Sequence, residues 1–462
     1  MQGTGQTALV LYNLYGPCLA LPRETTMMQR YPAYKNSGFD WLKEVPEHWE
    51  LKSIRAITKV KTERNKPDLP LLSVYRDYGV IYKDSRDDNH NRAGMDLSNY
   101  KVVAPNDLVI NKMKTWQGSL GVSQYEGIVS PAYIVCDLDD SINGLYLNYL
   151  LRCRFYVHAY NRISYGIRVD QWDMHYQDFK QLPVFLPSPE EQTAIVVFLE
   201  EQTAVINQFL TNKRRLIALL EEQKQVVINT AVTQGLDTAV ARKPSGIDWL
   251  GDIPANWQGI KLKHLSKFIQ TGPFGSQLHA HDYVDNGMPV INPIHLQNGR
   301  IVPDWSITVD NETLTRLERH QLEIGDVILA RRGELGRCAV VDSESAGWLC
   351  GTGSMNLRPR SDQVFSPYLA QIIQSEKVKT WLTTESVGST MDNLNGSILG
   401  NLKVPVPPIQ EQQQIIYLCR EREAEINTAI ERTQREIELI EEYRTTLIAT
   451  AVTGKIDVRP LE

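Results

Sequence analysis

Two segments of this sequence occur twice, and they follow the same order in each copy. Residues 37–49 (SGFDWLKEVPEHW) recur as residues 245–257 (SGIDWLGDIPANW), with 7 of 13 positions identical. Residues 182–237 recur as residues 402–457 without a gap, with 21 of 56 positions identical. Matches of this length indicate a tandem duplication, so we expect two similar halves. Each half has a variable middle followed by a more similar tail.

The variable middles, module 1 (residues 37–187) and module 2 (residues 245–407), share a skeleton of short patterns. Three patterns occur in both modules. A polar turn precedes an apolar run at 106–110 and 325–329, two glycines lie close together at 118–121 and 333–336, and a short apolar helix is predicted at 145–151 and 367–373. Such patterns predict a mixed α/β (α+β) domain of about 150 residues. One scaffold with different side chains fits two binding modules with different targets. Drift of a duplicated structural domain is the alternative.

The sequence of each tail predicts one long helix. The helices begin after proline-rich turns at 187–189 and 405–408 and end near Gly235 and Gly454. At about 40 residues each would be roughly 60 Å long. An apolar seam with coiled-coil spacing runs along both helices. Its positions are Ile206, Leu210, Ile217, Leu220 and Val227 in the first helix and Ile426, Ile430, Ile437, Ile440 and Leu447 in the second.

The two seams predict an antiparallel coiled coil within the chain, because a whole module connects the two helices. Both seams are interrupted at the same two places, Lys213/Thr433 and Lys224/Arg444. Such a pair would act as a spacer between the modules. From Ile206 to Val227 the rise is roughly 32 Å, against about 34–36 Å for one turn of B-DNA.

These patterns divide the chain into six parts. They are an N-terminal extension (1–36), module 1 (37–187), a first spacer helix (188–235), a linker (236–244), module 2 (245–407) and a second spacer helix with a tail (408–462). We found no counterpart of the extension in the second copy. We therefore expect it to be loose, with Met27 or Met28 as an alternative start.

The net charge of −6 is carried by the tails. Residues 190–237 carry −3 and residues 410–457 carry −4, which leaves +1 for the other 366 residues. A mildly acidic chain is unlike a polybasic protein that coats nucleic acid. Because the acidity lies in the helices, it does not count against DNA binding by the modules. It indicates instead that the helices face protein.

Cysteine and histidine spacing favours neither disulfides nor a metal site. The six cysteines, at positions 18, 136, 153, 338, 350 and 419, lie far apart and form no Cys-x-x-Cys pair. His279 and His281 form a lone His-x-His, which we interpret as a surface loop. No apolar run reaches the roughly 18 residues of a membrane span. We therefore expect reduced thiols in the cytoplasm and no membrane partner.

Catalytic motifs are missing from the sequence. It contains no phosphate-binding loop with its lysine, no Gly-x-Ser-x-Gly, no His-Glu-x-x-His and no Asn/Asp-Pro-Pro-Tyr. Acidic pairs such as Asp139-Asp140 fit turns or solvated helix faces. A self-contained methyltransferase or nuclease is therefore disfavoured.

The remaining candidates are residues suited to nucleic-acid contact. Basic and amide side chains that follow a strand beside a glycine turn can contact guanine edges, adenine or phosphates. In module 1 these are Lys112, Lys114, Trp116 and Gln117; in module 2 they are Arg331, Arg332 and Arg337, with Glu334 among them, and Ser276 in a further loop at 272–276.

With these features the chain resembles the specificity subunit of a type I restriction–modification system, over roughly residues 37–457. The resemblance rests on three duplicated elements. They are the Gly-x-Asp-Trp-Leu-x-x-x-Pro-x-x-Trp segments at 38–49 and 246–257, the Glu-Gln helix starts at 191–192 and 411–412, and the Thr-Ala-Val-Thr helix ends at 230–233 and 450–453.

The resemblance implies two globular target recognition domains separated by a long antiparallel coiled coil, in a pseudo-two-fold tandem repeat. Each domain would read one half of a split, asymmetric site on double-stranded DNA. The helices would set the gap and dock two type I methyltransferase subunits, which in turn hold the type I restriction subunits. The partners would use S-adenosylmethionine, ATP and Mg, whereas this chain would hold no cofactor and would not be an enzyme. A scaffold that pairs proteins through its coiled coil and never touches DNA remains the competing hypothesis.

Overall fold

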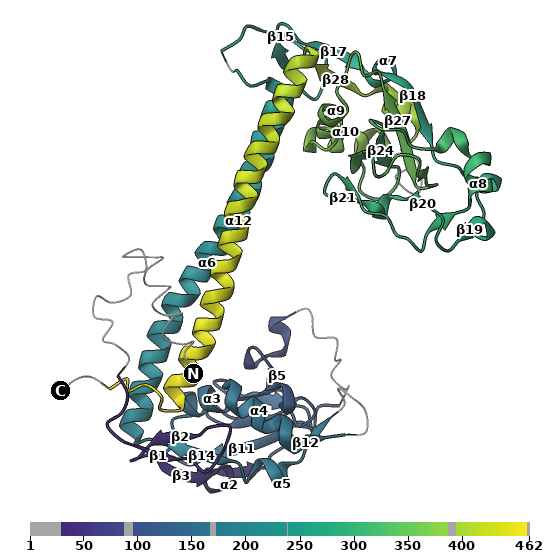
Figure 1. Cartoon of the computed structure of the whole chain (residues 1–462). Coiled ribbons are helices and arrows are strands. Elements are labelled where there is room, and N and C mark those ends of the chain that lie inside the picture. The colour runs from purple at the N-terminus through teal and green to yellow at the C-terminus, as the bar shows by residue number, and fades with distance from the viewer. Residues whose placement is uncertain (1–28, 87–95, 167–171, 238, 387–393, 460–462) are drawn as a thin grey trace. The chain divides into compact units, whose positions relative to one another are not determined.

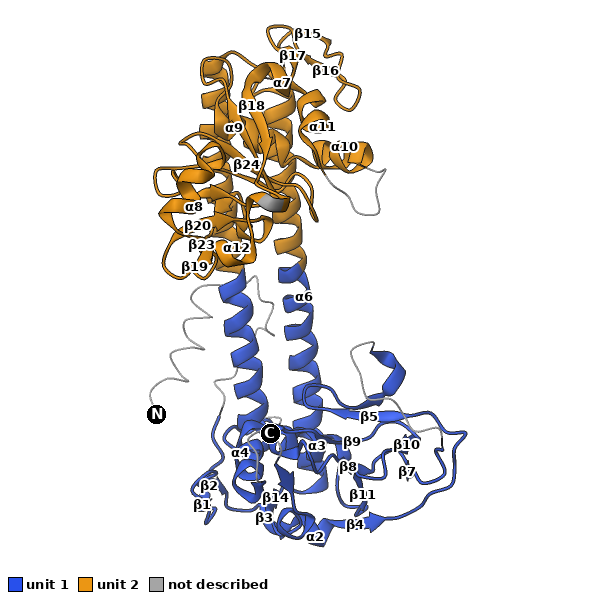
Figure 2. Cartoon of the chain, turned by 90° about the vertical axis from the view of Figure 1, so that its right-hand side faces the viewer, with its two compact units in different colours: residues 1–214, 434–462 blue, residues 215–433 orange. Residues whose placement is uncertain are grey.

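The computed structural model describes residues 29–86, 96–166, 172–237, 239–386 and 394–459 (Figure 1). The chain divides into two compact units, coloured separately in Figure 2. Unit 1 contains residues 1–214 and 434–462, and unit 2 contains residues 215–433. Each unit therefore combines one module with half of each long helix.

The centre of module 1 is an antiparallel sheet of four strands in the order β4–β11–β8–β9. These strands are β4 (Thr58–Lys61), β11 (Ile134–Leu138), β8 (Leu108–Ile110) and β9 (Leu120–Val122). Helix α3 (Gly144–Arg152) packs against β9 (Figure 2), and α4 (Arg154–Ile163) follows it. The side chain of Asn143 caps α3 by accepting hydrogen bonds from the main-chain N–H groups of Leu145 and Tyr146. This is the short apolar helix that the sequence predicted.

Five two-stranded pairings complete unit 1. They are β1 (Tyr34–Asn36) with β2 (Glu44–Pro46), β3 (Glu50–Ser53) with β14 (Pro183–Leu186), β5 (Leu72–Tyr75) with β6 (Gly79–Tyr82), β7 (Lys101–Val103) with β10 (Gly127–Val129), and β12 (Ser164–Tyr165) with β13 (Asp173–Met174). The short helices are α2 (Ile54–Ile57), η2 (Lys83–Ser85), η3 (Thr115–Gln117) and α5 (Tyr176–Phe179).

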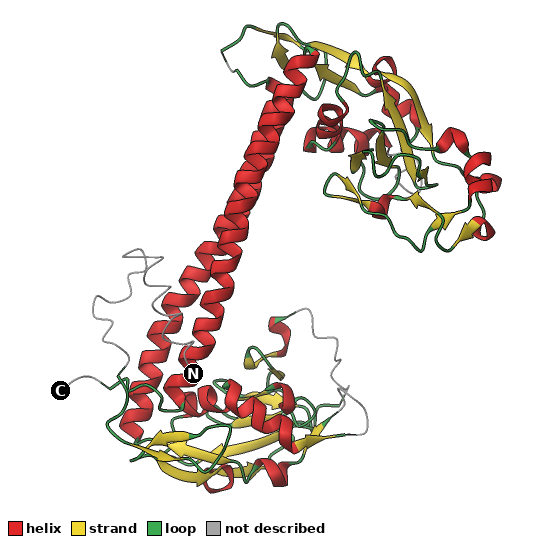
Figure 3. Cartoon of the chain, viewed as in Figure 1, coloured by secondary structure: helices red, strands yellow, loops and turns green. Residues whose placement is uncertain are grey.

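Module 2 repeats this plan in the same order, and like module 1 it combines strands with short helices (Figure 3). Its central sheet has the order β18–β27–β24–β25, formed by β18 (Ser266–Thr271), β27 (Ser354–Pro359), β24 (Val327–Ala330) and β25 (Cys338–Val340). The flanking pairs are β15 (Arg242–Pro244) with β16 (Asp252–Pro254) and β17 (Gln258–Lys261) with β28 (Lys403–Val406). Residues 242–244 were predicted as the end of a linker, but they form β15 and pair with module 2. The helices are α7 (Leu262–Leu265), α9 (Ser366–Ile373), α10 (Glu376–Ser386) and α11 (Gly396–Asn401). The duplication seen in the sequence is therefore a duplication of fold, and the expected mixed α/β class is confirmed.

Module 2 also carries an additional sheet. Its order is β19–β23–β20–β26, formed by β19 (Tyr283–Val284), β23 (Thr308–Val309), β20 (Met288–Ile291) and β26 (Leu349–Cys350), with β20 and β26 parallel. Nearby lie the hairpin β21 (Leu296–Gln297) with β22 (Arg300–Ile301) and the helices η4 (Gly275–Gln277), η5 (Ala280–Asp282), η6 (Pro293–His295), α8 (Asn311–Arg316) and η7 (Glu318–His320).

The long helices are α6 (Pro189–Gln234) and α12 (Ile409–Val452). Gly235 and Gly454 follow their ends with φ of +83° and +68°, the left-handed conformation that stops a helix. Two polar contacts in unit 1 establish that the helices run antiparallel there, and a third contact joins them in unit 2. In unit 1, Asn207 contacts Arg444 and Lys213 contacts Glu436; in unit 2, Lys224 contacts Asn427. Of the predicted polar interruptions, Lys213, Lys224 and Arg444 are thus paired across the helices, whereas Thr433 donates to the Ala429 carbonyl oxygen of its own helix.

The seam is buried to different degrees in the two units. Ile206, Leu210, Ile437, Ile440 and Leu447, all in unit 1, are buried. Ile217, Leu220, Val227, Ile426 and Ile430, all in unit 2, are half-buried. In the described part of the chain no helix is long and apolar enough to cross a membrane.

The prediction for the N-terminal extension was wrong for residues 29–36. Strand β1 pairs with β2 as β15 pairs with β16, at a constant offset of 208 residues, so the second copy does contain a counterpart. Tyr31 is only 3% exposed, and Gln29 forms a β-bridge with Asp457. A strand of three residues has too little apolar periodicity to be recognised in the sequence alone. Residues 1–28, including Met27 and Met28, lie outside the described residues.

The duplicated sequence motifs form the same contacts in both units. In unit 1 the indole Nε1 of Trp49 donates to Glu191 at 3.0 Å; in unit 2 Trp257 donates to Glu411 at 2.9 Å. Both tryptophans are fully buried. Each glutamate stands in the first turn of its helix, where the helix dipole favours a carboxylate. These bonds attach the start of each long helix to its own module.

Candidate nucleic-acid interface

The first group of predicted DNA-contact residues lies between β8 and β9 of module 1. Lys114 and Met113 are exposed, and Lys112, Trp116 and Gln117 are half-buried. The loop is held by the hairpin β12–β13, because the main-chain N–H of Met174 donates to the carbonyl oxygen of Lys112 at 2.9 Å. The structure therefore brings Lys112, Lys114, Trp116 and Gln117 together on one loop.

The same hairpin adds residues that sequence reasoning missed. The Lys112 ammonium lies 3.2 Å from Asp173 Oδ2, and the rings of Trp116 and Trp172 lie 5.2 Å apart. Tyr165 stacks on His175 with a ring separation of 4.6 Å. The aromatic-rich run at 172–176 was a usable indication, but its distance from residue 112 hid the contact. We define these residues, Lys112, Trp116, Tyr165, Trp172, Asp173 and His175, as the module 1 cluster.

In module 2, Arg331 is a positioning residue. Its carbonyl oxygen accepts from the N–H of Leu394 at 3.0 Å, as Lys112 accepts from Met174. Its guanidinium donates to the carbonyl oxygens of Leu394 and Thr352. Burial, with the nearby Arg332, lowers the pKa of Arg331. The side chain thus helps to hold the loop, because two of its N–H groups are bound to carbonyl oxygens inside the module.

Other predicted residues of module 2 differ in accessibility. Arg332 and Glu334 are exposed, whereas Arg337 is half-buried, and its Nε has no hydrogen-bond partner among the described residues. Glu334 pairs with Lys379 at 3.4 Å. Ser276 lies in η4, and its side chain is outside the described part. Among the basic residues predicted to contact DNA in module 2, Arg332 is therefore the one that is exposed to solvent.

A buried aspartate sets the start of each loop-bearing strand. Asp107 is 1% exposed and accepts from the Ala104 N–H and, at 2.9 Å, from Lys61. Its counterpart Asp326 is also 1% exposed and is bound by Arg358. Burial raises the pKa of Asp107, although both hydrogen-bond donors oppose this effect. The sequence pattern at 106–110 and 325–329 thus serves to place the loop and does not itself face solvent.

Cysteine and histidine side chains provide no metal centre in the described part of the chain. Cys136, Cys153, Cys338, Cys350 and Cys419 are unpaired and buried, and burial raises the pKa of each thiol to between about 11 and about 12. Cys18 lies outside the described residues. The rings of His279 and His281 stack on each other at 5.1 Å.

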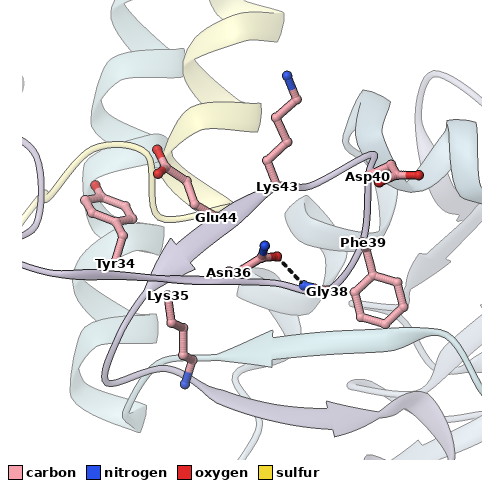
Figure 4. A pocket seen from close by; sticks show the side chains of 8 residues that line it. All are labelled: Tyr34, Lys35, Asn36, Gly38, Phe39, Asp40, Lys43 and Glu44. Atoms are coloured by element: carbon pink, nitrogen blue, oxygen red, sulfur yellow. Dashed lines mark hydrogen bonds between the residues drawn. The ribbon is translucent and has the colours of Figure 1, made fainter.

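A surface hollow lies elsewhere, between β1 and β2 (Figure 4). It is lined by Tyr34, Lys35, Asn36, Gly38, Phe39, Asp40, Lys43 and Glu44. Asn36 accepts from the Gly38 N–H at 2.8 Å and closes the turn. None of the predicted DNA-contact residues lines this hollow. The candidate interface therefore lies on surface loops away from this hollow.

Comparison with known proteins agrees with this geometry. Residues 254–439 match the family model of the Type I restriction modification DNA specificity domain. The chain is 23% identical over 443 residues to the type I restriction enzyme MjaVIII specificity subunit of Methanocaldococcus jannaschii, covering 93% of this chain and 98% of that relative.

Two solved structures share the fold. The HsdS subunit from Thermoanaerobacter tengcongensis matches with a TM-score of 0.53 at 17% identity, over 89% of this chain and 98% of that one. A chain from a study of complex assembly and conformational transition of the type I R-M system matches with a TM-score of 0.63 at 16% identity, over 89% of this chain and 99% of that one. Residues 254–439 therefore match the type I restriction modification DNA specificity domain, and over nearly its whole length the chain is similar to specificity subunits of type I restriction enzymes.

Proposed function

We propose that this chain reads a bipartite, asymmetric DNA site, with one half-site read by each module. The observation that carries the proposal is the equivalent loop in both modules. Met174 binds Lys112, and Leu394 binds Arg331, at corresponding positions of the two copies. The side chains that this shared anchor presents to solvent differ, with Met113 and Lys114 in module 1 and Arg332 in module 2. A common scaffold with different outward residues supports two half-sites of different sequence.

We further propose that α6 and α12 set the gap between the half-sites and dock two methyltransferase subunits. Restriction subunits would join through the methyltransferase. The exposed apolar side chains of Val197 and Tyr417, which occupy equivalent positions of the two helices, support a protein partner at each copy. S-adenosylmethionine, ATP and Mg would be bound by those partners. The complex would work in the cytoplasm, where the unpaired cysteines stay reduced.

Mapping of methyladenine across the genome tests this function. The chain is expressed with its type I methyltransferase partner, and methylation is compared with cells that lack the chain. We expect one bipartite motif to appear only when the chain is present. A genome with no such motif would contradict the proposal.

A second measurement separates a DNA reader from a protein scaffold. The complex is titrated with duplex DNA at rising salt concentration. A reader that neutralises several phosphates loses affinity linearly with the logarithm of salt concentration. Arg332→Ala and Lys114→Ala should each weaken binding and reduce that slope by about one. A protein scaffold would bind DNA weakly, and neither variant would change its DNA affinity or the dependence of that affinity on salt.

A further inference from the structure

The ion pair between Lys112 and Asp173 is the most unusual feature of the module 1 cluster. Its two side chains are 40% and 43% exposed, and the ammonium and the carboxylate oxygen Oδ2 lie 3.2 Å apart. A carboxylate at a surface that meets phosphates is repelled by them, so its presence there needs a reason.

Hydrogen bonding within the cluster is incomplete in the free protein. Oδ1 of Asp173 and Nε1 of Trp116 are both buried without a hydrogen-bond partner among the described residues. An unpaired buried polar atom costs free energy, so a cluster selected only for stability would satisfy both. The cost indicates that this arrangement serves binding.

Neighbouring contacts restrict where the ion pair can move. The backbone of Lys112 is bound to Met174, the residue after Asp173. The aromatic pair Trp116–Trp172 lies beside the same two chain segments, and Asn161 binds the carbonyl oxygen of Trp116 at 2.8 Å. The pair is therefore presented in a restricted geometry, which recognition of a base edge requires.

The chemistry of the pair matches one base pair in the major groove. A carboxylate only accepts hydrogen bonds, and cytosine presents an N4 amine donor at the outer position of its edge. The guanine partner presents two adjacent acceptors, O6 and N7, to which an ammonium can donate. In an A·T pair the adenine amine lies between two acceptors, N7 and the thymine O4, which repel a carboxylate.

We infer that Lys112 and Asp173 together read one C·G base pair in the half-site of module 1, with Asp173 accepting from cytosine N4 and Lys112 donating to guanine. This inference rests on the proposed function and names the residues that set one position of the site. The same arrangement is not repeated in module 2. There the counterpart of Lys112 is Arg331, whose guanidinium is bound to carbonyl oxygens inside the module.

Methyladenine mapping with variants of Asp173 tests the inference. Asp173→Asn, Asp173→Ala and the control Asp178→Asn, at an exposed carboxylate of the same module, are each co-expressed with the methyltransferase partner. We expect Asp173→Asn to change one C·G position of a single half-site toward A·T, because an amide pairs with adenine N6 and N7. Asp173→Ala should reduce the preference at that position by roughly 10- to 100-fold. The other half-site and the control should be unchanged.

Melting temperatures of all variants are measured beside the motifs. If Asp173→Asn retains the original motif at every position, the inference is overturned. It is overturned equally if methylation falls at all sites together with the melting temperature, since that result indicates a structural role. If Asp173→Ala fails to fold, the isosteric Asp173→Asn decides. A wild-type chain that directs no bipartite motif removes the proposed function itself, which distinguishes that failure from failure of the inference alone.

Discussion

The hydroxyl of Tyr146 binds the carbonyl oxygen of Val452 at 3.2 Å, although the two residues are 306 positions apart. The counterpart in unit 2 is Tyr368, which binds the carbonyl oxygen of Val232 at 3.0 Å. Each tyrosine belongs to the short apolar helix of one module, and each carbonyl belongs to the helix end contributed by the other copy. Every module is thus completed by the other repeat's helix, so neither repeat closes its core alone.

Removing either hydroxyl should destabilise its own unit. Both tyrosines are fully buried, and their hydroxyls also bind Phe185 and Pro405 carbonyl oxygens. Tyr146→Phe and Tyr368→Phe leave these acceptors without the donor, which should cost about 1–3 kcal/mol each. Urea unfolding measures the loss. Tyr417→Phe, at a side chain that is 69% exposed, is the matched control and should change nothing. Equal stability of all three variants would refute the role assigned to the hydroxyls.

The polar contacts between the long helices should be energetically coupled. Lys224–Asn427 and Arg444–Asn207 are equivalent pairs, with separations of 3.1 Å and 3.0 Å. A double-mutant cycle with alanine at Lys224 and Asn427 should give a coupling of about 0.5–1 kcal/mol, because Lys224 is only 14% exposed. The exposed pair Arg422–Glu425 within one helix should show no measurable coupling. Simple additivity at Lys224–Asn427 would show that the contact does not help to set the helix register.

Mild acid should destabilise unit 2. His295 and His320 are 4% and 3% exposed. Burial lowers the pKa of both histidines below the usual 6.5, and Arg319 adds to the effect at His320. Below pH 6.5 the unfolded chain therefore binds protons that the folded chain does not. Stability is fully present above that pH and falls as the pH drops, by at most about 1.4 kcal/mol per pH unit for each histidine.

Thermal unfolding between pH 7.5 and 5 checks this slope. His295→Gln and His320→Gln should each flatten it, whereas His281→Gln, at a side chain that is 80% exposed, should leave it unchanged. If all three variants keep the wild-type dependence of stability on pH, the acid sensitivity belongs to other groups.

Lengthening both helices should widen the DNA site. One heptad inserted between residues 206 and 227 and another between 426 and 447 add about 10 Å, which corresponds to about 3 bp at 3.4 Å per base pair. The mapped motif should keep both half-sites, and the gap between them should lengthen by about 3 bp. A heptad in only one helix puts the paired residues out of register, and methylation should then be lost. An unchanged gap in the double insertion would rule out the helices as a spacer.

Local patterns in the sequence were enough for the repeated fold and the long helices. Apolar periodicity and the stops at Gly235 and Gly454 depend on residues that are close in the chain, so they can be recognised without a structure. The DNA-contact candidates were only partly separable in this way. Arg331 and Arg332 are adjacent basic residues in the sequence, but one is bound to Thr352 and Leu394 and the other faces solvent.

By itself, then, the sequence determined that the chain is a duplicated mixed α/β protein with two long helices. Helical periodicity depends on neighbouring residues, and a duplication is visible when two segments of the same sequence are compared. Only the tertiary structure decided that Val452 completes module 1 and Val232 completes module 2, and that Asp173 meets Lys112. Contacts of this kind depend on how distant segments pack in space. No local spacing encodes them, which is why the exchange of helix ends became visible only in the fold.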